Sequence, residues 1–247
     1  MKEITTRSFR LAVYAKGDPD SEKLALVLPG RLDTKDYAHM RAHVDFLSMQ
    51  GYFALSFDPP GTWESPGGIE LYTTTNYLQA VDELIEHFGA KPTLLLGHSR
   101  GGAVAMLSST NPAVQAIAVM MANFGPPVAP RPEALKTGFQ ISKRSLPPGD
   151  QRGGEQRVFH LPINYFEDGI RYDPLSVFEK CLKPKLLVYG TDDEFTPAKK
   201  VKEIFADIPE PKMLHEVHTG HDYRYSPTEI EDVNDALGKF LKRYLWL

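Results

Sequence analysis

The sequence predicts one α/β domain in which a mostly parallel sheet is flanked by helices. The first observation is that short apolar runs alternate with amphipathic stretches along the chain, which is typical of βαβ units with right-handed crossovers. The second is a Gly-His-Ser-Arg-Gly sequence at residues 97–101, placed between a strand pattern and a helix pattern. The third is a length of 247 residues with 42% hydrophobic residues, which suits a single large packed domain.

The elements of this domain can be followed along the chain. Residues 4–15 and 23–28 predict two early strands, separated by a turn-rich segment. Apolar side chains recur at three- and four-residue steps over residues 36–50, which indicates an amphipathic helix that Gly51 would end. The elements expected after it are a strand at 52–57, a helix at 74–88, a strand at 93–96, a helix at 102–107 and strands at 113–121, 185–190 and 213–217.

Ser99 lies between two glycines, where a buried strand should turn directly into a helix. Such a turn holds the serine in a strained backbone conformation with its hydroxyl exposed. Side chains at positions 97 and 101 would collide with the neighbouring strand and helix, so glycine is needed at both. The pattern indicates a nucleophilic serine. The alternative is a structural serine on a glycine-rich turn in a protein that has lost its activity.

A nucleophilic serine needs an imidazole to take its proton and a carboxylate to orient that imidazole. On the fold that uses this turn, the chain order is serine, acid, histidine. The candidates that follow the last two predicted strands are Asp192, Asp193, His218 and His221. Open parallel sheets place their sites at the carboxyl ends of strands, where all of these residues lie. Gly220 permits a sharp turn directly before His221, which favours that histidine as the base.

These motifs resemble the α/β-hydrolase fold superfamily of serine hydrolases, and the likeness runs from about residue 24 to the C-terminus. Residues 28–31 (Leu-Pro-Gly-Arg) resemble the family's oxyanion loop, and residues 58–61 (Asp-Pro-Pro-Gly) its loop after the fourth strand. The resemblance implies Ser99 as nucleophile, Asp193 as acid and His221 as base, with an esterase-like activity. This chain departs from the family pattern at Pro29, where histidine is usual, and at Trp63, where glycine is usual.

The oxyanion hole is expected to consist of the backbone amides of Arg31 and Arg100. Their side chains need not take part; they could form salt bridges or bind an acidic substrate group. Three aromatic residues are expected in loops near the site, where they could line a substrate pocket or simply pack; they are Trp63, Tyr72 and Phe124.

Residues 123–183 interrupt the alternation of strands and helices. They hold no obvious core strand, begin with a proline-rich run at 125–132 and predict a helix near residues 133–142. A structureless loop of that length is unusual in a compact domain unless it is functional. We therefore expect a core domain of residues 1–122 and 184–247 with a cap or lid inserted at 123–183. The alternative is an insertion that only covers apolar surface.

The predicted function is hydrolysis of a small or medium carboxylic ester through an acyl-enzyme. Ser99 would attack the carbonyl, His221 would move the proton and Asp193 would orient His221. The same residues could cleave an amide or peptide bond or a carbon–carbon bond, or could support cofactor-free perhydrolysis or acyl transfer. A ligand receptor that no longer turns over is an alternative from another class.

Composition restricts the partners. The formal net charge of −4 gives no overall attraction to nucleic acid or to an anionic membrane. The single cysteine, Cys181, excludes an intramolecular disulfide and fits a reducing compartment. Residues 1–7 lack the apolar core of a secretory signal, no apolar run has the length needed to cross a membrane, and no spacing of histidines and cysteines suggests a metal site. We expect a cytoplasmic monomer or homodimer that acts on a small molecule without metal or cofactor.

Overall fold

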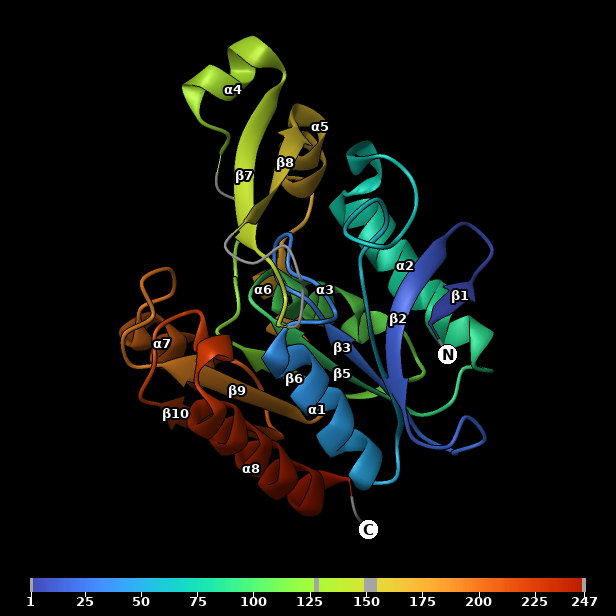
Figure 1. Ribbon diagram of the computed structural model, residues 1–247. Coiled ribbons are helices and arrows are strands. Elements are labelled where there is room, and N and C mark those ends of the chain that lie inside the picture. Colours follow the sequence, from blue (N-terminus) through green and yellow to red (C-terminus); the bar gives the residue numbers. More distant parts are fainter. Residues whose placement is uncertain (1, 127–128, 149–154, 246–247) are drawn as a thin grey trace.

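An eight-stranded sheet forms the centre of the protein in the computed structural model, which describes residues 2–126, 129–148 and 155–245 (Figure 1). The strand order is β1-β2-β4-β3-β5-β6-β9-β10. The strands from β4 to β10 in this order run parallel, whereas β1 and β2 pair antiparallel with their neighbours. Their bounds are β1 (Glu3–Thr5), β2 (Arg10–Lys16), β3 (Leu24–Leu28), β4 (Phe53–Phe57), β5 (Thr93–His98), β6 (Val114–Met120), β9 (Lys185–Gly190) and β10 (Lys212–Val217).

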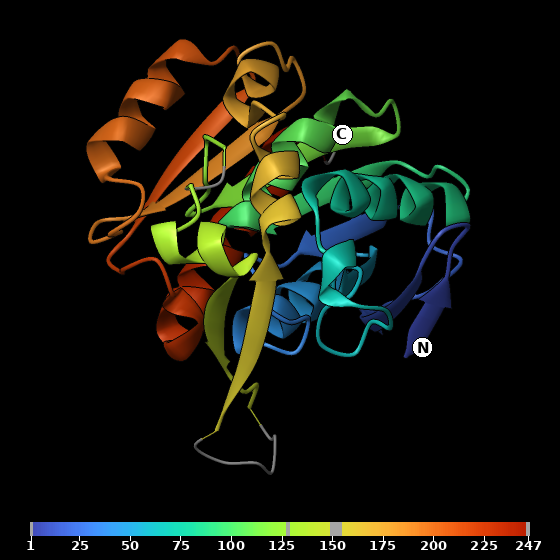
Figure 2. The same ribbon diagram turned by 90° about the horizontal axis from the view of Figure 1, so that it is seen from above.

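The inner strands are apolar along their whole length because helices cover both faces of the sheet. Every residue of β3, β4, β5 and β9 is buried, as expected for parallel strands packed on both sides. Helices α1 (Ala38–Met49) and α8 (Pro227–Tyr244) lie on one face. Helices α2 (Thr74–His87), α3 (Arg100–Leu107) and α7 (Ala198–Asp207) lie on the other (Figure 2). The layered α/β class is confirmed, and the other strands lie where predicted. The single strand expected at residues 4–15 is wrong: a turn closed by the Thr6 amide, which donates to the Phe9 carbonyl at 2.8 Å, divides it into β1 and β2.

Side-chain caps define the starts of two helices that frame the site. The Thr73 hydroxyl accepts a hydrogen bond from the Asn76 amide at 3.0 Å and so begins α2. The Ser226 hydroxyl accepts one from the Glu229 amide at the start of α8, where Pro227 occupies the first helical position. Short 3₁₀ turns, η1 (Ile69–Leu71), η2 (Ser108–Thr110) and η3 (Tyr223–Tyr225), complete the connections.

Residues 123–183 contribute no strand to the central sheet in their described part. Strands β7 (Phe139–Ser145) and β8 (Gln156–Pro162) pair antiparallel in a separate two-stranded sheet that projects from the body of the protein (Figure 1). The short helices of this segment are α4 (Pro132–Thr137), α5 (Ile163–Gly169) and α6 (Pro174–Phe178). Residues 127–128 and 149–154 of the segment lie outside the described residues.

The helix expected at residues 133–142 is only partly correct. Helix α4 ends at Thr137, because Gly138 adopts a left-handed conformation with φ of 83°, and β7 begins at the next residue. The prediction failed because a short helix followed by a strand was taken for one longer helix.

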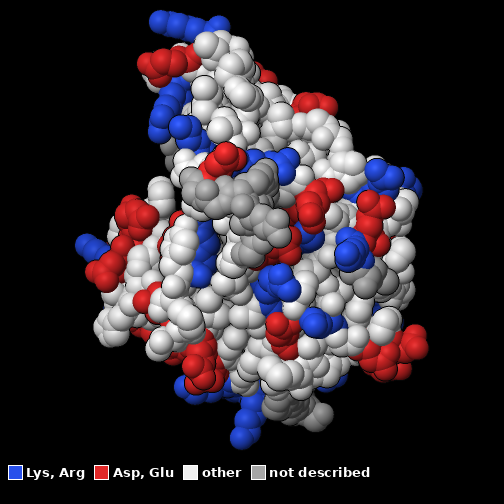
Figure 3. All heavy atoms as spheres, in the orientation of Figure 1, with Lys and Arg blue, Asp and Glu red and all other residues white. Residues whose placement is uncertain are grey.

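Among the described residues on the face seen in Figure 3, charged side chains of both signs intermingle and form no continuous basic surface. Within the described ranges, no helix combines the length and the apolar character needed to cross a bilayer.

Candidate active site

Ser99 alone forms the turn between β5 and α3. Its φ of 51° and ψ of −115° are the strained values that the sequence pattern predicts for this position. The turn is held from both sides, because the Ser99 amide donates to the Met120 carbonyl at 2.9 Å and the Ser99 carbonyl accepts from the Asn123 amide at 3.1 Å. A Cβ at Gly97 would lie 2.2 Å from the Gly101 carbonyl oxygen. One at Gly101 would lie 2.0 Å from the carbonyl oxygen of residue 28, so the predicted need for glycine at both positions is confirmed.

The structure brings Ser99, His221 and Asp193 together, although the last two follow different strands. Nε2 of His221 lies 2.8 Å from the Ser99 hydroxyl oxygen. Nδ1 of His221 lies 3.1 Å from each carboxylate oxygen of Asp193. The three side chains therefore form one chain of hydrogen bonds from carboxylate to hydroxyl. Asp192 and His218, the other candidates, are exposed, and the carboxylate of Asp192 accepts a hydrogen bond from the Thr191 hydroxyl instead.

The Asp193 carboxylate is buried and fixed in orientation. Its Oδ1 accepts hydrogen bonds from the amides of Phe195 at 2.8 Å and Thr196 at 3.0 Å. Burial raises the pKa of Asp193, but the hydrogen bond from His221 and those from the two amides outweigh it and hold the pKa below its ordinary value. The carboxylate is therefore ionised and can only accept, which fixes the proton of a neutral His221 on Nδ1.

The backbone amide and the backbone carbonyl of His221 each contact a side chain that was not among the predicted site residues. The His221 amide donates to the Glu194 carboxylate at 3.2 Å. Its carbonyl lies 3.0 Å from Nε2 of His98. The ring of Phe195 stands edge-on against the imidazole, with 4.7 Å between ring centroids. In the sequence, His98 directly precedes Ser99 and Glu194 directly follows Asp193, which is the signal that could have indicated them.

The two amides expected in the oxyanion hole lie in the loop after β3 and at the start of α3. Arg100 is the first residue of α3, so its amide precedes the first hydrogen bond within the helix. Among the described residues, no acceptor is found for the Arg31 amide. Both amides can therefore serve as donors to a ligand.

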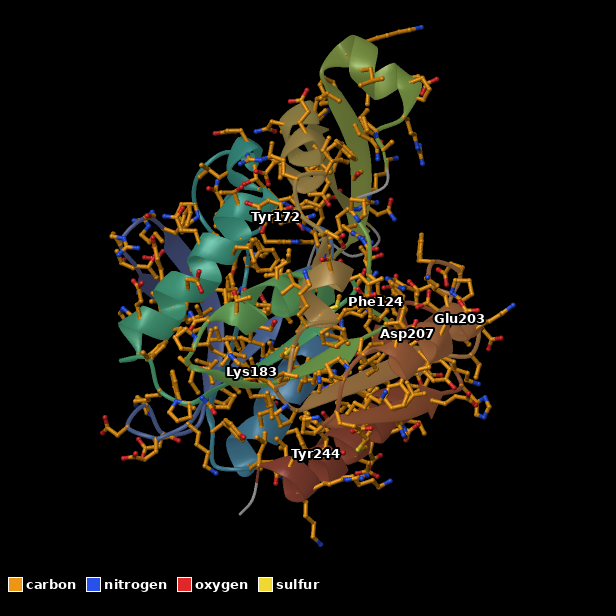
Figure 4. The ribbon with its side chains drawn as sticks, turned by 180° about the vertical axis from the view of Figure 1, so that it is seen from behind. Phe124, Tyr172, Lys183, Glu203, Asp207 and Tyr244 are labelled. Carbon is orange, nitrogen blue, oxygen red and sulfur yellow. The ribbon has the colours of Figure 1, made fainter. Side chains whose placement is uncertain are left out.

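Two of the three predicted aromatic residues support this oxyanion loop. The Leu32 amide donates to the Tyr72 hydroxyl at 3.0 Å, and Nε1 of Trp63 donates to the Leu32 carbonyl at 2.9 Å. These contacts hold Leu32 at a positive φ of 57°. Phe124 is buried beside α6, with its ring centroid 6.5 Å from that of Phe178 (Figure 4). That any of the three contacts a substrate stays a prediction.

The Arg100 side chain is buried away from carboxylates. It donates to the Tyr165 hydroxyl and the Thr74 hydroxyl, both at 3.0 Å, and lies 4.4 Å from the centroid of the Tyr165 ring. Within the described part of the chain, no carboxylate lies within 4.0 Å of the guanidinium, so the salt bridge considered from the sequence is not formed there. A cavity of about 20 Å³ beside it, lined in part by Tyr172 (Figure 4), has room for water but not for a substrate.

Asp33, His39 and His98 are buried, and their potential ligand atoms lie within 4.8 Å of one another. The geometry resembles that of a metal site, but the charges do not. Arg224 Nη1 lies 3.3 Å and Arg144 Nε 3.7 Å from Oδ1 of Asp33. These guanidiniums already compensate the carboxylate, so a buried divalent cation would face net repulsion. We do not assign a metal to this cluster.

Comparison with known proteins supports one family. A model of the "Alpha/beta hydrolase family" matches residues 25–233. Est1E from Butyrivibrio proteoclasticus, solved with ferulic acid bound, shares 21% identity with a TM-score of 0.76 and 99% of each chain covered. A monoacylglycerol lipase from Paleococcus ferrophilus shares 18% identity with a TM-score of 0.72, covering 94% of this chain and 98% of the other.

Mouse alpha/beta hydrolase domain-containing protein 10 shares 17% identity with a TM-score of 0.73 and 98% of each chain covered. No curated protein matches the sequence. These identities are low, so the solved structures establish the shared fold alone, whereas the family model covers most of the chain. We conclude that the protein belongs to the alpha/beta hydrolase family.

Proposed function

We propose that the protein is a serine hydrolase that cleaves a small or medium carboxylic ester through an acyl-enzyme. One observation carries the proposal. The Ser99 hydroxyl lies 2.8 Å from Nε2 of an imidazole whose other nitrogen lies 3.1 Å from a buried carboxylate. A serine on a strained turn, with a base and an orienting acid in reach, is the arrangement that nucleophilic acyl transfer requires.

The first half of the reaction forms the acyl-enzyme. Nε2 of His221 accepts the Ser99 proton as the hydroxyl oxygen bonds to the ester carbonyl carbon. The carbonyl oxygen becomes an oxyanion that accepts hydrogen bonds from the amides of Arg31 and Arg100. The intermediate collapses, the bond to the alcohol oxygen breaks, and His221 returns the proton to that oxygen. The second half repeats these steps with water as nucleophile, which releases the acid and restores Ser99.

Asp193 contributes in two ways to this mechanism. It keeps the His221 proton on Nδ1, so that Nε2 has a free lone pair for the serine proton. When Nε2 becomes protonated, the carboxylate also stabilises the positive charge of the imidazolium. Both effects depend on the amides of Phe195 and Thr196, which hold the carboxylate in place.

Residues 123–183 act as a cap in this proposal, above a core of residues 1–122 and 184–247. Support comes from the end of β7, which contacts the loop after β3. The Tyr37 hydroxyl donates to the Ser145 carbonyl at 2.8 Å, and the Arg144 guanidinium donates to the Arg31 carbonyl. The segment is thus attached to the same loop that supplies one oxyanion donor.

An ester is favoured over an amide or a diketone because an ester needs no special assistance to its leaving group. A monoacylglycerol lipase among the structural neighbours also supports this choice. The location in the cytoplasm and the state as monomer or homodimer remain predictions.

A fluorophosphonate probe tests the nucleophile, and short-chain nitrophenyl esters test the reaction. We expect one label per wild-type chain and turnover of the esters, with neither label nor turnover in Ser99→Ala. Ser108→Ala is the matched control, because Ser108 is a buried serine directly after α3 whose hydroxyl has no partner in the described part of the chain. It should label like the wild type. A label that persists in Ser99→Ala would refute the assignment, and a labelled wild type that turns over only amides or diketones would refute the ester.

A further inference from the structure

A second aspartate–histidine pair lies directly behind His221. His98 is the last residue of β5 and is 1% exposed. Its Nε2 lies 3.0 Å from the His221 carbonyl oxygen, and its Nδ1 lies 3.5 Å from Oδ2 of Asp33. The centroids of the His98 and His221 rings are 5.1 Å apart. A carboxylate and an imidazole are thus placed side by side, as in Asp193 and His221, but the second imidazole faces a backbone carbonyl, whereas His221 faces the Ser99 hydroxyl.

The chemistry of the acceptor fixes one proton of His98. A carbonyl oxygen can only accept, so the contact at 3.0 Å is a hydrogen bond only when Nε2 of His98 carries the proton. Nδ1 then faces the Asp33 carboxylate at a distance slightly longer than a hydrogen bond. Nδ1 of His98 has no hydrogen-bond partner in the described part of the chain, so the bond to the His221 carbonyl is what holds the ring, and the Asp33 carboxylate lies beside it.

Asp33 is itself fixed by residues from three other segments. Arg224 Nη1, just after the His221 loop, lies 3.3 Å from Oδ1, and Arg144 Nε of β7 lies 3.7 Å from it. Burial raises the pKa of Asp33, but His98 and the two guanidiniums outweigh it and hold that pKa well below its usual range. Gly30 leaves the space for this approach, because a Cβ there would lie 2.5 Å from Oδ2 of Asp33.

His98 and Glu194 together restrict the backbone of His221 from both sides. Glu194 accepts from the amide of His221, and His98 donates to its carbonyl. The direction of the imidazole depends on the orientation of this backbone, because only two side-chain torsions separate the ring from it. A displacement of about 1 Å at a reacting group can lower a rate about 100-fold. The hydrogen bond from His98 therefore acts at the place where a small movement has the largest effect.

We propose that His98, which lies beside Asp33, is a positioning residue that orients His221 toward Ser99. The inference rests on the proposed function, because it assigns His98 a role in the same reaction. It goes beyond that function by assigning the placement of the base to a histidine outside the three catalytic side chains. His98 does not contact the reacting atoms; it acts through the backbone of His221.

The surroundings of His98 provide a matched control. The groups that face it are Asp33, His39, His221 and Tyr223, with Arg144 and Arg224 on the far side of Asp33. The His39 ring is buried 5.0 Å from the His98 ring, and neither of its nitrogens has a partner in the described part of the chain. His39→Phe removes an imidazole from the same cluster without removing a bond to His221.

Three variants separate positioning from packing. His98→Phe keeps the ring shape and removes the donor, and we expect kcat for a short-chain nitrophenyl ester to fall about 30- to 100-fold with KM within about threefold. His98→Gln places an amide N–H near the position of Nε2 and should recover kcat to within about fivefold of the wild type. His39→Phe should stay within about threefold of the wild type, as expected for a residue outside the hydrogen-bond chain. A folded His98→Phe protein with wild-type kcat, or no recovery in a folded His98→Gln protein, would overturn the inference.

A second measurement needs no enzymatic activity. In protein labelled with ¹⁵N-histidine, NMR should show His98 protonated at Nε2, and the signal is assigned by its loss in His98→Gln. Wild-type His98 protonated at Nδ1 alone would exclude the bond to the His221 carbonyl and end the inference. If wild-type protein neither labels with fluorophosphonate nor hydrolyses esters, the proposed function fails. The NMR result still decides whether the hydrogen bond from His98 to the His221 carbonyl exists.

Discussion

Replacing Asp193 by asparagine should leave the shape of the site intact and move the proton of the neutral His221 ring from Nδ1 to Nε2. Oδ1 of Asp193 accepts from the amides of Phe195 and Thr196, so the asparagine oxygen is expected to keep that place. The asparagine NH₂ then occupies the position of Oδ2, which lies 3.1 Å from Nδ1 of His221. A donor facing Nδ1 favours the tautomer with the proton on Nε2, and Nε2 can then no longer accept the Ser99 proton.

The size of the effect follows from that tautomer. A serine triad whose aspartate is replaced by asparagine loses about 10,000-fold in kcat, because the imidazole holds its proton on the wrong nitrogen. This corresponds to about 5.4 kcal/mol of transition-state stabilisation at about 1.36 kcal/mol for each factor of ten. We expect Asp193→Asn to reach this loss, with fluorophosphonate labelling of Ser99 slowed in parallel. Thermal unfolding should stay near that of the wild type, because the amides of residues 195 and 196 keep their acceptor.

The assay is steady-state hydrolysis of a short-chain nitrophenyl ester, corrected for correctly folded protein by circular dichroism. Asp192→Asn is the matched control, since the neighbouring carboxylate is exposed and accepts only from the Thr191 hydroxyl among the described residues. It should retain activity within about threefold, as is usual for a surface substitution. An Asp193→Asn protein with more than about a tenth of wild-type kcat would refute the tautomer argument. Equal losses in both variants would do so as well.

Two further predictions concern stability. Gly101→Ala should lower the melting temperature strongly or prevent folding, because its Cβ would lie 2.0 Å from the Leu28 carbonyl oxygen; a wild-type melt by circular dichroism would contradict this. Burial raises the pKa of Glu83, but hydrogen bonds from Ser8, Gln79 and Thr6 outweigh it and lower the pKa from 4.5 to about 2. The unfolded chain therefore takes up the proton first, so this stabilisation is present above pH 4.5 and is lost as the pH falls toward 2. The free energy of unfolding of Glu83→Gln, measured with urea, should lack this part of the pH dependence. A pH dependence equal to that of the wild type would show that Glu83 is not its source.

The sheet and the serine turn were predictable from sequence because their signals are local. Fully buried strands such as β3 and β9 appear as unbroken apolar runs, and the glycines around Ser99 are required by contacts within a few residues. Helices α7 and α8 are not among the predicted elements, although Ser226 and Pro227 are typical of a helix start. The resemblance to a known family indicated Asp193, which residue types alone left level with Asp192.

The contacts behind the site were not predictable, because they join residues far apart in sequence. Arg224 and Asp33 meet across 191 positions, and His98 bonds a carbonyl 123 positions away. The pattern of apolar and polar residues in the sequence does not indicate which buried charged residue will pair with a residue in a distant loop. Trp63 and Tyr72 illustrate the same limit. Their nearness to the site was expected, but their hydrogen bonds to Leu32 depend on how the loop after β3 folds back.

The guanidinium that joins β7 to the loop after β3 has a consequence for protein engineering. Arg144 donates to the carbonyl of Arg31, whose amide is a proposed oxyanion donor. A chimera that grafts a hairpin from another hydrolase onto this scaffold would leave that carbonyl without its donor. Such a graft would have to bring an arginine to the same place, or the peptide at residue 31 would need redesign before any new specificity could be selected.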